Sequence, residues 1–373
     1  MKRKLRLKPS ALRVLKIIGI IIFILVSLLV FYFVQVNDLK KIGYSRKAAN
    51  QILIKFKKKD VIDIGKNKTL NKAFESDAYK EKNFDSYTKI KYQNHAHLIE
   101  NINKLLKKGY TNEEVSVILA HGSDSDVSEF AKRDKVRYLD EFYTIDFAKI
   151  KYYDRYLDYM DSSREDEETS VLIVNLEMDK EEYEDPVEVK KFSYDMLVNK
   201  HRMLSKNFVP DDLITIGLDY ASEKGLKANR TALIAAKQMI DQAEKEGYQL
   251  VINSAYRSYE DQEEVENTYR DLYGDNYVSK YVLRPGFSEH QTGLSFDIGS
   301  RKANVFIQSA EYKWIVENCY RFGFIYRFKT DFEEITGIRH EAWHYRYVGK
   351  KIAKYIYDNN ITLEEYYVRF LDK

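Results

Sequence analysis

Two short stretches of the sequence hold the side chains best suited to chemistry. Residues 288–297 read SEHQTGLSFD, and residues 340–347 read HEAWHYRY. His290, Asp297 and His344 could hold a metal ion by three protein bonds and leave a fourth position open for water, which is the pattern of a catalytic zinc site. A structural zinc site more often closes all four positions with protein ligands, many of them thiolates, and a chain with a single cysteine cannot supply that set.

The spacing of these residues limits how they could meet. His290 and Asp297 are seven positions apart, so they do not share one face of a helix. A turn at Gly293 that leads into a strand could bring both side chains to one metal ion. Glu341 lies three positions before His344, close enough to place a carboxylate beside the metal without binding it, as expected of a general base. Taken singly, a His near an Asp is usually an ordinary hydrogen-bonded pair.

The residues around these positions resemble a known family. SEHQTGLSFD and HEAWHYRYVG are similar to the signatures S-x-H-x-x-G-x-A-x-D and E-P-W-H-x-R-Y-V-G of the VanY-like zinc D-alanyl-D-alanine carboxypeptidases of the vancomycin-resistance type, which have L,D-carboxypeptidase relatives. Further matching blocks follow in the family's order: SAYRSYEDQ from Ser254, LRPGFSEHQTG from Leu283 and EYKWIVENCYRFGFIYRF from Glu311. The resemblance covers roughly residues 187–367.

The resemblance implies a metal centre and a proton carrier. It assigns His290, Asp297 and His344 as ligands of a Zn²⁺ cofactor. It assigns Glu341 as the base that takes a proton from the water activated by the metal and passes it to the leaving amine.

The resemblance also implies contacts with the substrate. Arg257 would polarise the scissile carbonyl and stabilise the oxyanion, and Gln262 and Ser288 would lie near the substrate. The sequence departs from the family pattern at Ser295, where alanine is usual, and at Ala342, where proline is common. Neither change removes a coordinating or proton-transferring group, so we expect activity to be retained.

The resemblance implies an α+β fold, with a small antiparallel sheet that carries the zinc site and helices packed around it. A helix is expected over Thr231–Glu246, with Asn229 as its N-cap, followed by a strand over Tyr248–Ala255 that places Arg257 at a strand end. The last helix is expected over Ile352–Leu371. The carboxypeptidase domain is predicted to occupy residues 187–373.

The N-terminal region has the pattern of a membrane anchor. Residues 17–36 form an uncharged apolar run, and seven lysines and arginines lie within residues 1–16. Twenty helical residues span about 30 Å, the thickness of the hydrocarbon core, and the features of a cleaved signal peptide are lacking. We therefore predict a cytoplasmic basic tail at 1–16, a single transmembrane signal anchor at 17–36, and an extracellular catalytic domain.

A helical module with two tandem repeats is predicted over residues 37–169. One copy begins KIGYS at Lys41 and the other KKGYT at Lys107, and NFDSYTKI from Asn83 aligns with YYDRYLDY from Tyr152 if about three residues are inserted. In each copy Gly-Tyr-Ser/Thr predicts a helix stop followed by the N-cap of the next helix. An acidic surface loop is expected at residues 162–169, and a strand at Val171–Leu176.

Composition narrows the function further. The 373 residues include 61 basic and 58 acidic side chains, a balance that gives no support to nucleic-acid binding. The predicted function is removal of the terminal D-amino acid from peptidoglycan stem peptides by a membrane-anchored D,D-carboxypeptidase. The alternatives are an L,D-carboxypeptidase acting on tetrapeptide stems, a peptidoglycan endopeptidase, and a non-catalytic wall-binding protein. Protein partners of the repeat module are left open.

Overall fold

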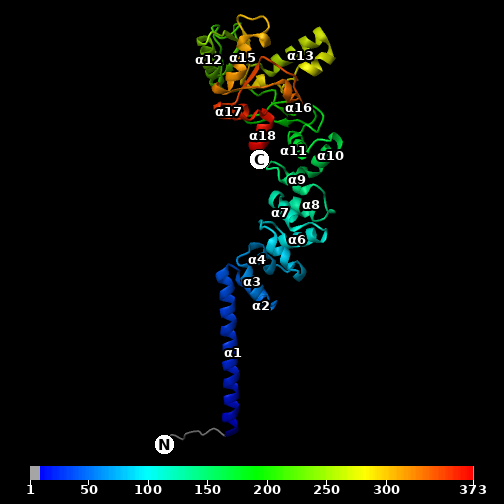
Figure 1. Ribbon diagram of the computed structural model, residues 1–373, viewed down its shortest axis with the longest axis vertical. Helices are drawn as coiled ribbons and strands as arrows, with labels where there is room; N and C mark the ends of the chain where they lie inside the picture. The colour runs from blue at the N-terminus through cyan, green and yellow to red at the C-terminus, as the bar shows by residue number, and fades with distance from the viewer. Residues whose placement is uncertain (1–8, 373) are drawn as a thin grey trace. The chain divides into compact units, whose positions relative to one another are not determined.

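The computed structural model describes residues 9–372, which divide into two compact units (Figure 1). Of the described residues, the first unit comprises 9–145 with Lys149–Tyr153, and the second comprises Asp146–Ala148 with 154–372. Residues 1–8 of the basic tail predicted at 1–16 lie outside the described residues. The domain limits at 169 and 187 stay predictions.

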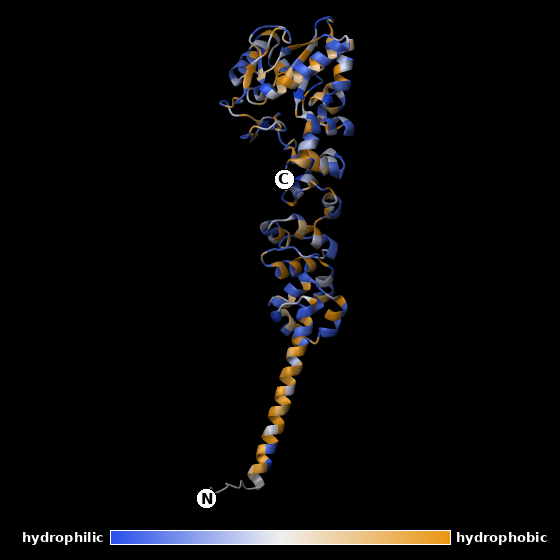
Figure 2. Ribbon diagram, turned by 90° about the vertical axis from the view of Figure 1, so that its left-hand side faces the viewer, coloured by the Kyte–Doolittle hydropathy of each residue, from blue (hydrophilic) through white to orange (hydrophobic). Residues whose placement is uncertain are grey.

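The first unit begins with one long apolar helix, α1 (Pro9–Ile42). Its 34 residues correspond to about 51 Å, more than the hydrocarbon core of a membrane requires. It contains the whole predicted segment 17–36, and Figure 2 shows it as apolar over nearly all of its length. By length and composition α1 could be a membrane anchor or a signal sequence.

Short helices make up the rest of the first unit, and both predicted helix boundaries are confirmed. Gly43 and Gly109 adopt positive φ angles of 113° and 92°, and the hydroxyls of Ser45 and Thr111 accept hydrogen bonds from the first turn of the following helices. The elements are α2 (Arg46–Ile54), α3 (Lys58–Ile64), α4 (Lys68–Glu75), η1 (Glu81–Asn83), α5 (Phe84–Lys89), α6 (Leu98–Lys107), α7 (Asn112–His121), α8 (Asp124–Phe130), α9 (Leu139–Tyr143) and η2 (Ile150–Tyr152).

A buried tyrosine–asparagine hydrogen bond occurs twice along the chain, each time with a tyrosine from one of the two aligned segments. The hydroxyl of Tyr87 donates to Oδ1 of Asn103 at 2.6 Å, and that of Tyr156 donates to Oδ1 of Asn175 at 2.7 Å. In each case the asparagine amide donates to the main-chain carbonyl nine residues before the tyrosine. The repeat starts are 66 residues apart, the tyrosines 69 and the asparagines 72, so the two hydrogen bonds agree in partners and differ in spacing, and the three-residue insertion stays a prediction.

The second unit opens with two helices, α10 (Tyr153–Ser163) and α11 (Glu167–Asn175). The strand predicted at Val171–Leu176 is wrong, because this segment is helical. Asp166 caps α11 by accepting from the amide of Thr169, and the apolar run is too short for its periodicity to distinguish a buried helix from a strand. The predicted acidic loop is reduced to the few residues between the two helices.

The core of the second unit is a four-stranded antiparallel sheet in the order β5-β6-β8-β7. The expected small antiparallel sheet is therefore confirmed. The sheet contains β5 (Leu250–Ser254), β6 (Ser295–Ser300), β7 (Phe324–Tyr326) and β8 (His344–Tyr347). Two further pairs are β1 (Val187–Glu188) with β2 (Arg202–Met203), which are parallel, and β3 (Leu213–Thr215) with β4 (Lys227–Asn229), which are antiparallel.

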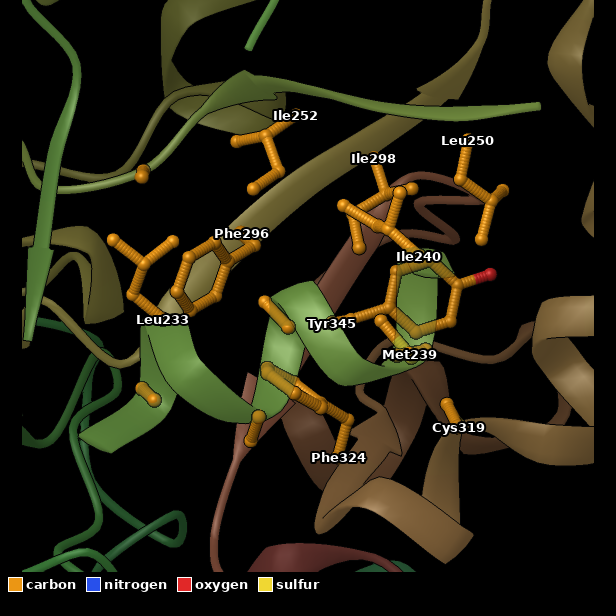
Figure 3. Close-up of a cluster of buried hydrophobic side chains, with 14 of the residues drawn as sticks. Leu233, Met239, Ile240, Leu250, Ile252, Phe296, Ile298, Cys319, Phe324 and Tyr345 are labelled. Carbon is orange, nitrogen blue, oxygen red and sulfur yellow. The ribbon is translucent and has the colours of Figure 1, made fainter. Parts of the chain in front are cut away.

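Helix α12 (Arg230–Lys245) packs its apolar face against one side of this sheet (Figure 3). Leu233, Met239 and Ile240 of the helix meet strand side chains that include Phe296 and Ile298. The side chain of Asn229 accepts hydrogen bonds from the amides of the first turn, as predicted, and α12 begins and ends one residue before the predicted bounds.

The remaining helices surround the sheet and connect its strands. They are α13 (Tyr259–Tyr273), α14 (Asp275–Tyr281), η3 (Glu289–Thr292), η4 (Phe306–Gln308), α15 (Ala310–Asn318), η5 (Cys319–Phe322), η6 (Thr330–Phe332), α16 (Glu333–Thr336), α17 (Lys350–Asn359) and α18 (Leu363–Phe370).

The single C-terminal helix predicted at Ile352–Leu371 is wrong, because α17 and α18 are separate helices. Asn360 takes a left-handed conformation with φ of 48° and ends α17, and Thr362 forms a capping box with Glu365 that starts α18. The break turns Glu364 into the interior, where it is fully buried.

Removing the asparagine of one repeat should loosen that repeat alone. Asn103→Ala removes the acceptor of the Tyr87 hydroxyl and of the Asn83 amide and the donor to the carbonyl of Ala78, and each buried group left unsatisfied costs about 1–3 kcal/mol. We expect the free energy of opening of α5 and α6 to fall by about 2–4 kcal/mol, measured by hydrogen–deuterium exchange of the full-length protein in detergent micelles.

Asn37 provides the matched control, because it lies 66 residues before Asn103, at the equivalent repeat position, and is exposed. Asn37→Ala should change the same free energy by less than about 0.5 kcal/mol. Equal effects of the two substitutions would show that the buried hydrogen bonds do not stabilise the repeat.

Candidate functional site

Strand alternation places two of the three candidate metal ligands on the same side of the sheet. In β6, Phe296 and Ile298 point toward α12, so Asp297 points to the opposite face. Asp297 pairs directly with His344 of β8, whose neighbour Tyr345 also belongs to the core against α12. The sheet thus has one apolar face and one face that carries the site.

The third ligand reaches the same point through a tight turn. His290 lies in η3, and Gly293 ends that turn with a φ of 68° before β6 begins. A Cβ atom at Gly293 would lie 3.1 Å from the amide nitrogen of Asn229, which donates to the Gly293 carbonyl. The positive φ and this close approach both favour glycine here. The expectation that a turn at Gly293 joins His290 to Asp297 is confirmed.

The three side chains form a compact group with the donor atoms of a metal site. One ligand atom from each of His290, Asp297 and His344 lies within 4.8 Å of the others. The Oδ1 atom of Asp297 is 3.4 Å from Nε2 of His290 and 3.3 Å from Nδ1 of His344. All three residues are largely shielded from solvent. Within residues 9–372 this is the one group of histidine and carboxylate side chains found with metal-ligand geometry.

Hydrogen bonds on the far side of each imidazole fix which nitrogen faces the centre. Nδ1 of His290 donates to the carbonyl of Ala255 at 2.6 Å, and Nε2 of His344 donates to Oε2 of Glu289 at 3.2 Å. The remaining nitrogens therefore present lone pairs to the common point, as metal-binding histidines do. Among the described residues, the buried Oδ1 of Asp297 finds no hydrogen-bond donor. These residues fit a divalent cation.

The electrostatics of the centre favour the metal-binding protonation states of His290 and Asp297. Burial lowers the pKa of His290, which keeps this imidazole neutral at pH 7. Although burial alone would raise it, the two histidines hold the pKa of Asp297 below its usual range. The pKa of His344 shifts in the other direction: despite burial, the carboxylates of Asp297 and Glu289 raise it to about 9. Metal binding at His344 therefore competes with a proton.

Glu341 lies beside this centre with the properties of a proton carrier. Its Oε2 atom is 3.6 Å from Nδ1 of His344, and its amide is anchored to the carbonyl of Phe328. Burial, reinforced by the negative charge of Asp297, raises the pKa of Glu341 to about 7, while His344 acts in the opposite direction. A carboxyl group that titrates near neutral pH can both accept and return a proton.

Arg257 follows β5 and is held by two side chains. Its Nη1 donates to Oε1 of Gln262 at 2.7 Å, and its Nη2 lies 3.4 Å from Oγ of Ser254. Gln262 is itself buried and donates from Nε2 to the carbonyl of Leu283 at 2.7 Å. The direct contact of Gln262 is therefore with the arginine.

One cavity of about 450 Å³ brings all of the sequence-predicted site residues together. Ser288, whose Oγ atom accepts from the amide of His290 at 3.4 Å, lines it as well. His340 also faces the cavity, with its Nε2 atom 2.5 Å from the hydroxyl of Tyr326. The predicted site residues on this wall are Arg257, Gln262, Ser288, His290, Asp297, Glu341 and His344.

Glu289 is the functional residue that sequence reasoning missed. Its Oε1 atom accepts from Nε of Arg327 and from Nη1 of Arg346, each at 2.9 Å, while its Oε2 atom accepts from His344. Burial would raise its pKa, but the two guanidinium groups hold the pKa of Glu289 well below its usual range. Its position between Ser288 and His290 was the available signal, but sequence alone did not show that its carboxylate is buried.

Comparison with known proteins supports the same stretch of the chain. Residues 225–350 match the family model described as VanY, D-alanyl-D-alanine carboxypeptidase. The bifunctional D-Ala-D-Ala dipeptidase and carboxypeptidase VanXYC of Enterococcus gallinarum is 31% identical over 181 residues, which cover 46% of this chain and 92% of that protein. The chain belongs to the VanY family. The resemblance predicted from the motifs is therefore confirmed.

Other relatives share the VanY-like region and differ elsewhere. YodJ of Bacillus subtilis is 42% identical over 46% of this chain and 66% of its own length. A D-alanyl-D-alanine carboxypeptidase of Enterococcus faecium is 38% identical over 35% of this chain and 40% of its own length. The chain thus spans less than two thirds of these two relatives. The solved LD-carboxypeptidase LdcB is 38% identical, with a TM-score of 0.46 over 51% of this chain and 92% of that structure.

Glu289 should control metal affinity without contacting the metal. Glu289→Gln leaves Arg327 and Arg346 beside a neutral amide and weakens the acceptor that orients His344. We expect Zn²⁺ affinity to fall about 10–100-fold, measured by competition with a chromogenic chelator. Glu341→Gln, which changes a carboxylate outside the ligand set, should bind Zn²⁺ nearly as tightly as the unaltered protein. Normal affinity of a folded Glu289→Gln protein would contradict this role.

Proposed function

We propose that this protein is a zinc-dependent D,D-carboxypeptidase that removes the terminal D-alanine from the stem peptides of peptidoglycan. The observation that carries the proposal is the arrangement of a three-ligand metal centre, the Glu341 carboxyl group and the Arg257 guanidinium around one cavity. Two imidazoles and one carboxylate favour zinc among the common divalent ions. Membership of the VanY family, with relatives named for D-Ala-D-Ala cleavage, supports this substrate class.

Each residue of the cavity has a part in the proposed reaction. A zinc ion held by His290, Asp297 and His344 would supply Lewis acidity, which activates water and polarises the scissile carbonyl. Glu341 accepts the proton of the attacking water and delivers it to the nitrogen of the departing D-alanine. Arg257, held in place by Gln262, donates hydrogen bonds to the carbonyl oxygen as negative charge develops on it. Ser288 contributes to the substrate-binding wall.

We further propose that α1 anchors the chain in the bilayer through residues 17–36. The basic residues of the segment 1–16 favour a cytoplasmic N-terminus, which would place residues 37–373 outside the cell. Residues 37–169 would then lie between the anchor and the catalytic residues along the chain, and the tether would keep the enzyme near newly made stem peptides. Added protease should cleave the protein in intact spheroplasts and spare α1. Complete protection would contradict this orientation.

Release of free D-alanine tests the activity directly. We expect the full-length protein in detergent to release D-alanine from a stem pentapeptide, and a zinc chelator to abolish the release. A stem tetrapeptide assayed in parallel separates D,D- from L,D-carboxypeptidase activity, and a cross-linked dimer reports endopeptidase cleavage. Failure to release D-alanine from the pentapeptide by zinc-loaded protein would overturn the proposal.

Two substitutions separate metal binding from proton transfer in the same assay. Glu341→Ala should keep the zinc and lower the turnover number by about 10²–10⁴-fold, since general acid–base catalysis contributes that much. His344→Ala should lose both zinc and hydrolysis, because it removes one of three ligands. Near-normal turnover by Glu341→Ala would contradict the role given to this carboxyl group.

A further inference from the structure

A row of tyrosine rings extends from the catalytic cavity along α13 and α14. The rings of Tyr269, Tyr273, Tyr277 and Tyr281 follow one another with centroid distances of 5.8, 4.7 and 4.7 Å. Tyr269 also stacks on Tyr277, at 6.0 Å and with an interplanar angle of 5°. These four residues are called the tyrosine row below.

The tyrosine row begins at the machinery of the proposed reaction. Gln262, Val265, Tyr269 and Tyr273 are spaced by three or four residues, so they share one face of α13. Gln262 holds Arg257 at one end of that face. Tyr269, Tyr277 and Tyr281 line the cavity, while Tyr273 does not. The row therefore leads outward from the arginine.

Core packing does not account for these aromatic residues. Gln262 is the buried residue of α13, and Val278 is the buried residue of α14. Tyr269, Tyr273 and Tyr281 are 38%, 59% and 48% exposed. A contiguous group of exposed rings beside a cavity marks a surface that binds something, and tyrosine suits ligands with both an apolar face and polar groups.

We propose that the tyrosine row binds the saccharide of the glycan strand to which the stem peptide is attached. This inference rests on the proposed function. If the carboxyl end of the stem peptide lies at Glu341, the amino end of the peptide points out of the cavity, and its five residues in extended conformation reach about 17 Å.

The group bonded to the amino end of the stem peptide is an N-acetylated sugar. A pyranose ring presents a flat C–H face to an aromatic ring, and its hydroxyls can bond to phenol oxygens.

Charge around the row favours a neutral saccharide over a lipid surface. Arg270 is paired with both Glu266 and Asp275, so this basic side chain is already neutralised by two carboxylates. Helix α13 is acidic overall, since its sequence YEDQEEVENTYRDLY contains six acidic residues and one arginine; Glu260 is paired with Lys206, and the guanidinium of Arg339 lies over the ring of Tyr281 at the far end of the row. Anionic lipid headgroups would be repelled there, whereas an uncharged sugar would not.

The test compares one peptide with and without its sugar. Full-length protein in detergent is assayed on a stem pentapeptide and on the same peptide attached to its disaccharide. We expect Tyr273→Ala to lower kcat/KM on the disaccharide substrate about tenfold, mainly through KM, and to leave the free peptide within about twofold. Tyr273→Phe should keep most of the activity. Leu272→Ala, which removes a neighbour that is 65% exposed but off the row, should leave both substrates unchanged.

Each other outcome is decisive. An equal loss of kcat/KM by Tyr273→Ala on both substrates would show that the row binds the peptide. No loss on either substrate would show that the row does not bind the substrate. Both results overturn the inference. If the unaltered protein hydrolyses neither substrate, the proposed function fails. The row is then tested by NMR titration with peptide-free glycan oligosaccharide. Binding to the unaltered protein that is lost in Tyr273→Ala supports the inference, and absence of binding to the unaltered protein overturns it.

Discussion

The site depends on one buried carboxylate, that of Glu289. Removing a carboxylate from water costs several kcal/mol unless charged donors surround it, and Glu289 has Arg327 and Arg346 on one oxygen and His344 on the other. Arg327 is in turn held by the carboxylate of Glu364 from α18. The network therefore joins η3, the end of β7, strand β8 and the C-terminal helix. The candidate ligand His344 is part of this network, so its orientation depends on contacts distant in sequence.

The same sheet serves stability and chemistry because its two faces differ. Alternation along β6 and β8 sends Phe296, Ile298 and Tyr345 into the core against α12. It sends Asp297 and His344, which are directly paired, to the other side. A rigid antiparallel pair thus holds two ligands at a set separation. The turn before β6, where Gly293 has a positive φ, carries His290 to the same point.

The helical repeats follow a different principle of construction. Each copy closes on a buried asparagine that accepts from a tyrosine hydroxyl and donates to a main-chain carbonyl. Short helices bury little apolar area on their own, so a satisfied polar contact gives each copy a specific closure. The Gly-Tyr-Ser/Thr boundary was readable in the sequence because capping is local. The hydrogen bond across about twenty residues was not, because it needs the helices to be packed.

Much of the candidate site and several of the helices could be predicted from the sequence, because they depend on residues close together in the chain. Residue type, spacing and resemblance are enough to predict the candidate metal ligands, Glu341, Arg257, the capped helix α12 and the apolar helix α1. Only the tertiary structure decided that Val171–Leu176 is helical, that the last helix breaks at Asn360 and that Glu289 is buried. These three features depend on contacts between side chains that are far apart in the sequence. Burial and pairing of charges are properties of the packed molecule, whereas turns, caps and ligand spacing are properties of neighbouring residues.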